Sequence, residues 1–256
     1  MFLPPDASVA QNLMSTQRPL PLKLDQTNRF DRFLAVGNEA VFRRLQAVAA
    51  QTESQAVWLF LHGPSGSGKT HLLQAAAQAW SSRRGRALYL PLGDKGGWQP
   101  EALQGLLGVG LYCLDNLQDI AGDAEWERAV FALLNRVRDE QAQLIMASAR
   151  PLPALDIALP DLRSRLAWGE QLAVNLPDEA ALADLLALRA RQQGIRLDER
   201  ALRYLLQRLE RNPAALTRAL QLIGDYSLSA RRRITLPLIR EALAQESVVA
   251  SQGDTP

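Results

Sequence analysis

Gly63-Pro-Ser-Gly-Ser-Gly68-Lys69-Thr70 is the stretch that decides the fold of this chain. It matches the pattern GxxxxGK[ST] at every fixed position, and it follows the apolar run from Val57 to Leu61. Glycines at this spacing let the backbone aim N–H groups at phosphate oxygens, and the start of the next helix adds the positive end of its dipole. A chance glycine-rich turn is disfavoured because strand and helix patterns flank the motif correctly. The predicted nucleotide-binding residues are Gly63, Pro64, Ser65, Gly66, Ser67, Gly68, Lys69 and Thr70.

A second apolar run, Leu111-Tyr-Cys-Leu-Asp115-Asn116, ends in one acidic residue followed by an amide. Lys69 would reach the β and γ phosphates, and Thr70 together with Asp115 would hold Mg²⁺. A carboxylate at position 116 could polarise an attacking water, whereas the amide of Asn116 is a far weaker base. The chain is therefore predicted to bind a nucleotide and to hydrolyse it slowly or not at all. The alternative is that Asn116 is only a loop residue and another group serves as the base.

Short apolar runs alternate with helical patterns from Phe30 to Pro177. Continuous apolar runs of this kind are typical of parallel strands that are buried on both faces, so an α/β fold with a parallel five-stranded sheet flanked by helices is predicted. The expected strands are Ala56–His62, Ala87–Leu92, Val109–Asp115, Gln143–Ser148 and Gln171–Leu176, with helical segments near 39–51, 69–82, 100–107, 123–140 and 160–166.

The pattern changes after Pro177. Apolar residues then recur at helical spacing over 178–193, 198–210, 213–228 and 236–245, with Asp178 and Asp198 as expected N-caps. This pattern predicts a small all-α domain after the α/β domain. The expected division is a flexible arm over 1–28, an α/β nucleotide-binding domain over 29–177, a helical lid over 178–247 and a disordered tail over 248–256.

Composition excludes several classes of protein. The 256 residues are 47% hydrophobic and 22% charged with a net charge of +2, so no overall basic field demands nucleic acid as a partner. The single Cys113 excludes an intramolecular disulfide and fits a reducing, cytoplasmic setting. The apolar runs are too short to span a bilayer, and no secretory signal is evident, so no membrane association is expected.

Three further stretches carry a family resemblance: Phe30-Asp-Arg-Phe33 with Gly37-Asn38, Asp115-Asn116 with Ile120-Ala-Gly-Asp123, and Pro160-Asp-Leu-Arg-Ser-Arg165-Leu-Ala-Trp168-Gly169. Together they resemble the AAA+ module of the DnaA family of replication initiators, and more closely its shorter Hda-type members, which are regulatory inactivators. The resemblance runs from about Gln17 to Leu243. It implies an AAA+ P-loop sheet followed by a lid, and a bound ADP or ATP with Mg²⁺.

The resemblance also implies roles for individual residues. Phe30 and the segment to Gly37 would pack near the adenine. Arg165 would be an arginine finger, given in trans to ATP on a neighbouring DnaA, which would then hydrolyse its ATP and become inactive. A finger raises phosphoryl-transfer rates by roughly 10³–10⁵ and needs no catalytic base on its own subunit, in agreement with Asn116. The alternative for Arg165 is a surface arginine in a salt bridge.

The arm contains a matching peptide, Gln17-Arg18-Pro-Leu20-Pro21-Leu22. It resembles the segment by which Hda-type proteins dock on the replication sliding clamp, the β subunit of DNA polymerase III. Arg18 replaces a leucine of that segment. The implied partners are DnaA and the clamp, with DNA contacted mainly through the clamp, and a homo-oligomer is also compatible.

Two positions depart from the family pattern. Ala214 stands where relatives carry a lid sensor arginine, and Ala149 replaces an acidic residue, leaving Ser148 as the polar candidate for sensing phosphate. Both losses fit a protein that binds ADP and does not switch by its own hydrolysis. The predicted function is negative regulation of replication initiation. The alternatives are an autonomous DNA-dependent AAA+ ATPase such as a helicase loader, or a truncated initiator; a small-molecule kinase is a distant third.

Overall fold

The computed structural model describes residues 25, 28–51, 55–92, 99–106, 108–209 and 213–252. Its centre is a five-stranded sheet with the strand order β2-β3-β4-β1-β5, and every neighbouring pair is parallel. The predicted parallel α/β sheet is therefore confirmed. The strands are β1 (Trp58–His62), β2 (Ala87–Pro91), β3 (Leu111–Asp115), β4 (Gln143–Ser148) and β5 (Glu170–Ala173).

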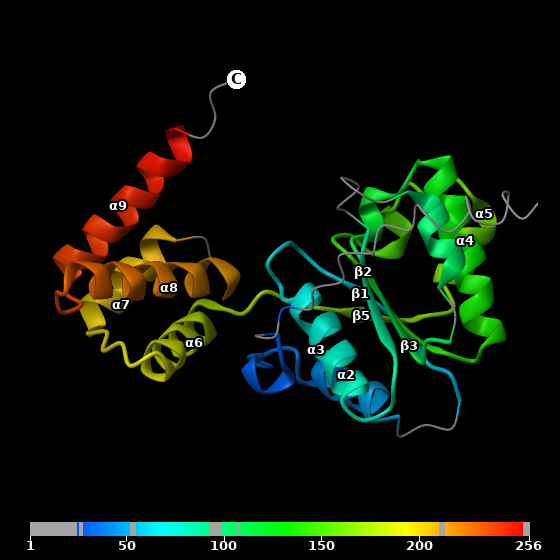
Figure 1. Ribbon diagram of the computed structural model, residues 1–256, viewed down its shortest axis with the longest axis horizontal. Helices are drawn as coiled ribbons and strands as arrows, with labels where there is room; N and C mark the ends of the chain where they lie inside the picture. Colours follow the sequence, from blue (N-terminus) through cyan, green and yellow to red (C-terminus); the bar gives the residue numbers. More distant parts are fainter. Residues whose placement is uncertain are drawn as a thin grey trace, which may run out of the picture.

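Alternate side chains of the strands feed two separate hydrophobic clusters, one on each face of the sheet. Phe60, Tyr112 and Met146 belong to the cluster under α4 (Ala124–Asp139) and α5 (Pro160–Leu166). Leu61, Cys113 and Ile145 belong to the cluster under α2 (Glu39–Ala50) and α3 (Lys69–Ser81). Figure 1 shows these helix pairs on opposite faces of the sheet. Burial on both faces explains the continuous apolar runs.

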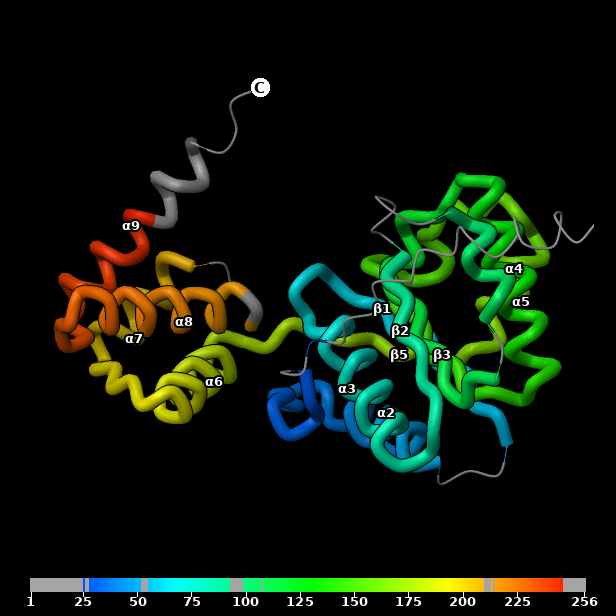
Figure 2. The backbone as a smooth tube through the Cα atoms, viewed as in Figure 1, coloured from blue at the N-terminus to red at the C-terminus, as the bar shows by residue number. Residues whose placement is uncertain are grey.

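A helical region follows the sheet and has its own core. Its helices are α6 (Glu179–Gln192), α7 (Glu199–Arg208), α8 (Pro213–Ala230) and α9 (Leu236–Gln252), packed around residues such as Leu186, Leu205 and Ile223. Asp178 and Asp198 cap the first two of these helices, accepting hydrogen bonds from Ala181 N at 2.8 Å and Ala201 N at 2.7 Å, as predicted. Figure 2 shows one extended segment joining β5 to α6.

Short 3₁₀ helices occupy the connections. They are η1 (Phe30–Arg32), η2 (Pro100–Gly105), η3 (Leu117–Asp119) and η4 (Leu152–Ala154). The helical segment expected near 100–107 is therefore η2, a 3₁₀ helix with proline at its start. In the described part of the chain, no helix combines the length and apolar character needed to cross a membrane.

Candidate functional site

The glycine-rich loop joins the carboxyl end of β1 to the start of α3. Gly66 and Gly68 have φ values of 80° and 98°, in the left-handed region that favours glycine. A Cβ atom at Gly63 would lie 2.1 Å from Val174 O, and one at Gly68 would lie 2.7 Å from Phe33 Cε2. The backbone of this loop is therefore too closely packed for side chains at these glycines, as a cradle for phosphate requires.

Lys69 lies inside this cradle. Its Nζ donates hydrogen bonds to Gly63 O at 2.7 Å, to Pro64 O at 2.9 Å and to Ser67 Oγ at 3.4 Å. Burial lowers the pKa of Lys69, and the nearby charge of Asp115 partly opposes that shift. The ammonium group is thus held mainly by neutral oxygens, and an anionic phosphate would be a far better partner for it.

Asp115 is almost completely buried and is the centre of a hydrogen-bond network. Its Oδ2 accepts from Thr70 Oγ1 at 2.6 Å and from Tyr89 Oη at 2.9 Å, and its Oδ1 accepts from Asn116 N at 2.9 Å. The two residues predicted to hold Mg²⁺, Thr70 and Asp115, are therefore brought together. The described residues contain no group of three or more His, Cys, Asp or Glu that could hold a metal. A hard cation here would need phosphate or water oxygens as further ligands.

Tyr89 was missed by sequence reasoning. It lies on β2, next to β3, with its ring near Asp115. Burial raises its pKa far above the usual value, and the negative charge of Asp115 adds to the effect. Tyr89 therefore remains a neutral hydrogen-bond donor to Asp115. The only sequence signal is a polar-tipped aromatic residue in the neighbouring buried strand.

Asn116 has a left-handed backbone, with φ 60° and ψ 44°. Its Oδ1 accepts from Gln118 Nε2 at 3.4 Å, and Gln118 Oε1 accepts from Ala149 N at 2.8 Å. Gln118 thus links Asn116, where a hydrolysing enzyme would carry a second acid, to Ala149, where the family pattern has an acidic residue. Ser148, the remaining polar candidate beside them, is fully buried, and its Oγ accepts from Arg150 N at 3.1 Å.

Aromatic rings cover the outer side of the loop. Phe33 contacts Gly68, stacks on Phe42 at 5.8 Å and lies 5.5 Å from the ring of His71. Phe30, the residue expected near the adenine, packs edge-to-face on Phe42 at 5.5 Å. The loop therefore meets this aromatic group through Phe33. Burial lowers the pKa of His71, whose Nε2 lies 2.8 Å from Arg29 O.

Arg165 lies in the last turn of α5, with one face of its guanidinium stacked on Trp168. Its Cζ is 4.0 Å from the centre of the Trp168 ring, and that ring is 5.9 Å from the ring of Trp58. Trp168 is 54% exposed. Within the described residues Arg165 forms no salt bridge. The arrangement holds an arginine on an aromatic support and leaves its charge without an acidic partner among these residues.

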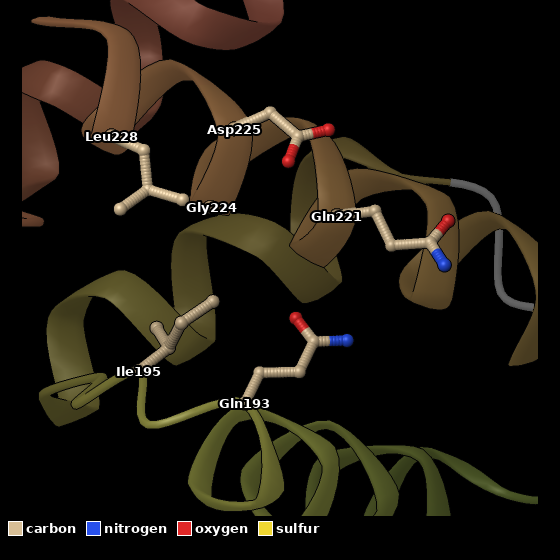
Figure 3. Close-up of a pocket in the computed structure, with 6 residues that line it drawn as sticks. All are labelled: Gln193, Ile195, Gln221, Gly224, Asp225 and Leu228. Atoms are coloured by element: carbon tan, nitrogen blue, oxygen red, sulfur yellow. The ribbon is translucent and has the colours of Figure 1, made fainter.

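Other predicted residues lie outside this site. Gln17, Leu20, Pro21 and Leu22 are outside the described residues, as is the side chain of Ala214. A separate pocket of about 420 Å³ lies in the helical region (Figure 3), lined by Gln193, Ile195, Gln221, Gly224, Asp225 and Leu228. None of the predicted site residues lines it.

Comparison with known proteins gives two family matches. The model of the Hda lid domain matches residues 178–243, and the model of the bacterial DnaA ATPase domain matches residues 24–91. Together these matches cover just over half of the chain. The first falls on helices α6 to α9, and the second includes η1, α2, β1, the glycine-rich loop, α3 and β2.

Solved structures show the same fold. Domain III of the Thermotoga maritima replication initiation protein DnaA is 21% identical, with a TM-score of 0.74 over 87% of this chain and 98% of that one. AMPPCP-bound DnaA from Aquifex aeolicus is 25% identical, with a TM-score of 0.67 over 78% of this chain and 66% of that one. The Thermotoga maritima RuvB branch migration motor is 17% identical, with a TM-score of 0.60 over 84% and 73%. With its five-stranded sheet and Hda-type lid, the chain is an Hda-like member of the DnaA-related AAA+ proteins.

Proposed function

We propose that this chain binds an adenine nucleotide, ADP or ATP, in the loop from Gly63 to Thr70. The buried Lys69 supports this proposal, because its hydrogen-bond partners among the described residues are neutral oxygens. The Aquifex aeolicus DnaA, which binds AMPPCP, supports it independently. Thr70 and Asp115 would hold Mg²⁺, which neutralises phosphate charge when bound. Because position 116 carries an amide, hydrolysis by this chain alone would be slow or absent.

We further propose that Arg165 acts in trans, on the nucleotide of a neighbouring DnaA. Trp168, which supports Arg165, packs on Trp58 at the amino end of β1, whereas the phosphate-binding loop follows the carboxyl end of β1. Five residues of a strand span about 16 Å, which is more than an arginine side chain reaches. Arg165 would therefore serve a second subunit. Arg165 lies near the amino ends of the strands, opposite the carboxyl ends where its own loop lies, and this position is the observation that carries the proposal.

These two parts combine into a negative regulator of replication initiation. The nucleotide-bound protein would dock on the DNA-loaded sliding clamp through Gln17, Leu20, Pro21 and Leu22, and would stimulate hydrolysis of DnaA-bound ATP in the cytoplasm. DNA would be contacted mainly through the clamp, although the DnaA from one similar structure is bound to single-stranded DNA itself. An autonomous DNA-dependent ATPase remains the second candidate, and its mark would be ATP hydrolysis by this chain alone when DNA is added.

The test adds this protein, ADP and DNA-loaded clamp to ATP-bound DnaA and follows the loss of ATP. Arg165→Ala should lower the stimulated rate of ATP loss roughly 10³–10⁵-fold, because the finger supplies charge that stabilises the transition state. Nucleotide binding should be retained. Arg83→Ala, at an exposed arginine after α3, is the matched control and should leave the rate unchanged. Undiminished stimulation by Arg165→Ala would refute the assignment.

A second experiment addresses the clamp separately. Replacing Gln17, Leu20 and Leu22 by alanine should remove clamp binding in a pull-down, because the leucines would no longer fill apolar pockets. Binding that persists after the triple replacement would reject the motif without bearing on Arg165.

A further inference from the structure

Glu127, on α4, is a buried carboxylate that lies outside the nucleotide site described above. Only 1% of its surface is exposed. Oε1 accepts hydrogen bonds from Gly122 N at 2.8 Å and Ala158 N at 3.0 Å, and Oε2 accepts from Leu159 N at 2.7 Å. Burying a carboxylate is costly unless hydrogen bonds compensate for the lost water. Here three backbone N–H groups, from two separate segments, provide that compensation.

The two segments are functionally distinct. Gly122 lies in the turn that follows η3, just after Asp115 and Asn116. Ala158 and Leu159 immediately precede α5, the helix that carries Arg165. Glu127 therefore ties the loop beside the nucleotide site and the start of the Arg165 helix to one point on α4.

Helix α5 has few local features that would hold its start. It has only seven residues, and a helix this short is marginal unless tertiary contacts support it. Its N-cap residue, Leu159, makes no side-chain cap, and Pro160 has no N–H to donate. Leu162 and Leu166 fix the body of the helix in the core. The backbone at its start is held by Glu127, through Ala158 N and Leu159 N, and by Arg163, whose Nη2 donates to Ile157 O.

We infer that Glu127 is a positioning residue for Arg165: it fixes the start of α5 and thereby the place at which the guanidinium meets the partner's nucleotide. This inference rests on the trans-acting role proposed for Arg165. The carboxylate matters more than the size of the side chain. In Glu127→Gln one oxygen becomes an NH₂ group, which then faces a backbone N–H where an acceptor stood.

The decisive experiment measures stimulated DnaA ATP hydrolysis with Glu127→Gln, at varied concentrations of this protein. The maximal rate should fall about 10–100-fold, because a displacement near 1 Å can cost 10²-fold in a phosphoryl transfer that depends on geometry. Nucleotide affinity should remain that of the unaltered protein. Glu125→Gln makes the same change at an exposed position of α4 and should leave the rate unchanged.

Two further measurements distinguish positioning from general stability. Glu127→Gln should add no loss to Arg165→Ala, because both act through the same guanidinium; an additional loss in the double variant would contradict the inference. Amide hydrogen exchange over residues 158–168 should accelerate in Glu127→Gln, while exchange in β1 and α3 stays unchanged. Exchange that is unchanged over 158–168 would overturn the anchoring role.

The outcomes separate this inference from the proposed function. If Arg165→Ala stimulates normally, the proposed function fails, and the role of Glu127 in positioning a finger fails with it. If Arg165→Ala is inactive and Glu127→Gln is fully active, only the role of Glu127 fails. If Glu127→Gln does not fold, Leu159→Pro replaces it. The φ of Leu159 is −79°, which proline accepts. The change removes the backbone N–H of residue 159, which donates to Glu127 Oε2 at 2.7 Å, while Glu127 itself stays intact. Full activity of Leu159→Pro would equally overturn the inference.

Discussion

Trp168 provides a quantitative test of how Arg165 is held. The ring lies 4.0 Å from the guanidinium carbon, and more than half of its surface is exposed. A cation–π contact at an exposed site contributes about 0.5–1 kcal/mol. If this energy pre-orients Arg165, Trp168→Ala should lower the maximal rate of stimulated DnaA hydrolysis about 2–5-fold, since about 1.4 kcal/mol corresponds to tenfold. Trp168→Phe keeps an aromatic face and should lose less than about twofold.

The same change should weaken the fold slightly. Trp168 also packs on Trp58, and an aromatic pair contributes about 0.5–1.5 kcal/mol, so with the cation–π contact the free energy of unfolding should fall by about 1–2.5 kcal/mol in Trp168→Ala. Stimulated ATP loss and urea unfolding measure the two effects. A Trp168→Ala rate as low as that of Arg165→Ala would show that the ring does more than support the arginine. A rate equal to that of the unaltered protein would refute the pre-orientation.

Two further predictions concern the nucleotide loop and the core. Gly68→Ala should abolish nucleotide binding in a fluorescent-ADP titration and destabilise the fold by more than about 1 kcal/mol, because φ is 98° and Phe33 lies 2.7 Å from the new Cβ; near-normal affinity would contradict the packing. Burial, followed by the charge of Asp115, raises the pKa of Cys113 above its usual value near 9. The unfolded chain then loses the thiol proton first as pH rises, so stability that is complete below pH 9 should fall by about 1.4 kcal/mol between pH 8 and pH 10. In urea unfolding of Cys113→Ala the decrease should be smaller by this amount, because only Tyr89 and other groups with shifted pKa values remain to contribute; an equal decrease in both proteins would exclude Cys113 as a source.

Much of the site could be predicted because local pattern and parallel topology determine it. The carboxyl ends of parallel strands meet at one edge of a sheet, so Thr70 after β1 and Asp115 at the end of β3 were expected to lie together, and they are 2.6 Å apart. The N-caps Asp178 and Asp198 could be predicted because each bonds to a backbone N–H only three residues further along the chain. The acceptors of Lys69 lie within six residues of it.

Residues that act across long sequence separations could not be predicted. Tyr89 bonds to Asp115 across 26 positions, and Glu127 bonds to Leu159 across 32. Neither belongs to a short motif. A helical period can place a carboxylate on the inward face, but it does not say which distant groups satisfy that carboxylate. Glu127 is buried on α4 next to Trp126, and its partners Ala158 and Leu159 lie more than thirty positions away.

The sequence alone determined the chemistry that this chain can hold: a phosphate-binding loop, one acidic residue with an amide beside it, and a helical lid. These follow from residue type, spacing and hydrophobic period, which are local properties. Only the tertiary structure decided where Arg165 lies relative to its own loop and what supports it. That separation depends on the packing of Trp168 against Trp58, which lie 110 positions apart in the sequence, and on the parallel course of β1 and β5. Contacts between residues far apart in the sequence form only when the whole chain folds. Burial and hydrogen bonding then select one tertiary arrangement among the many that the local sequence pattern allows.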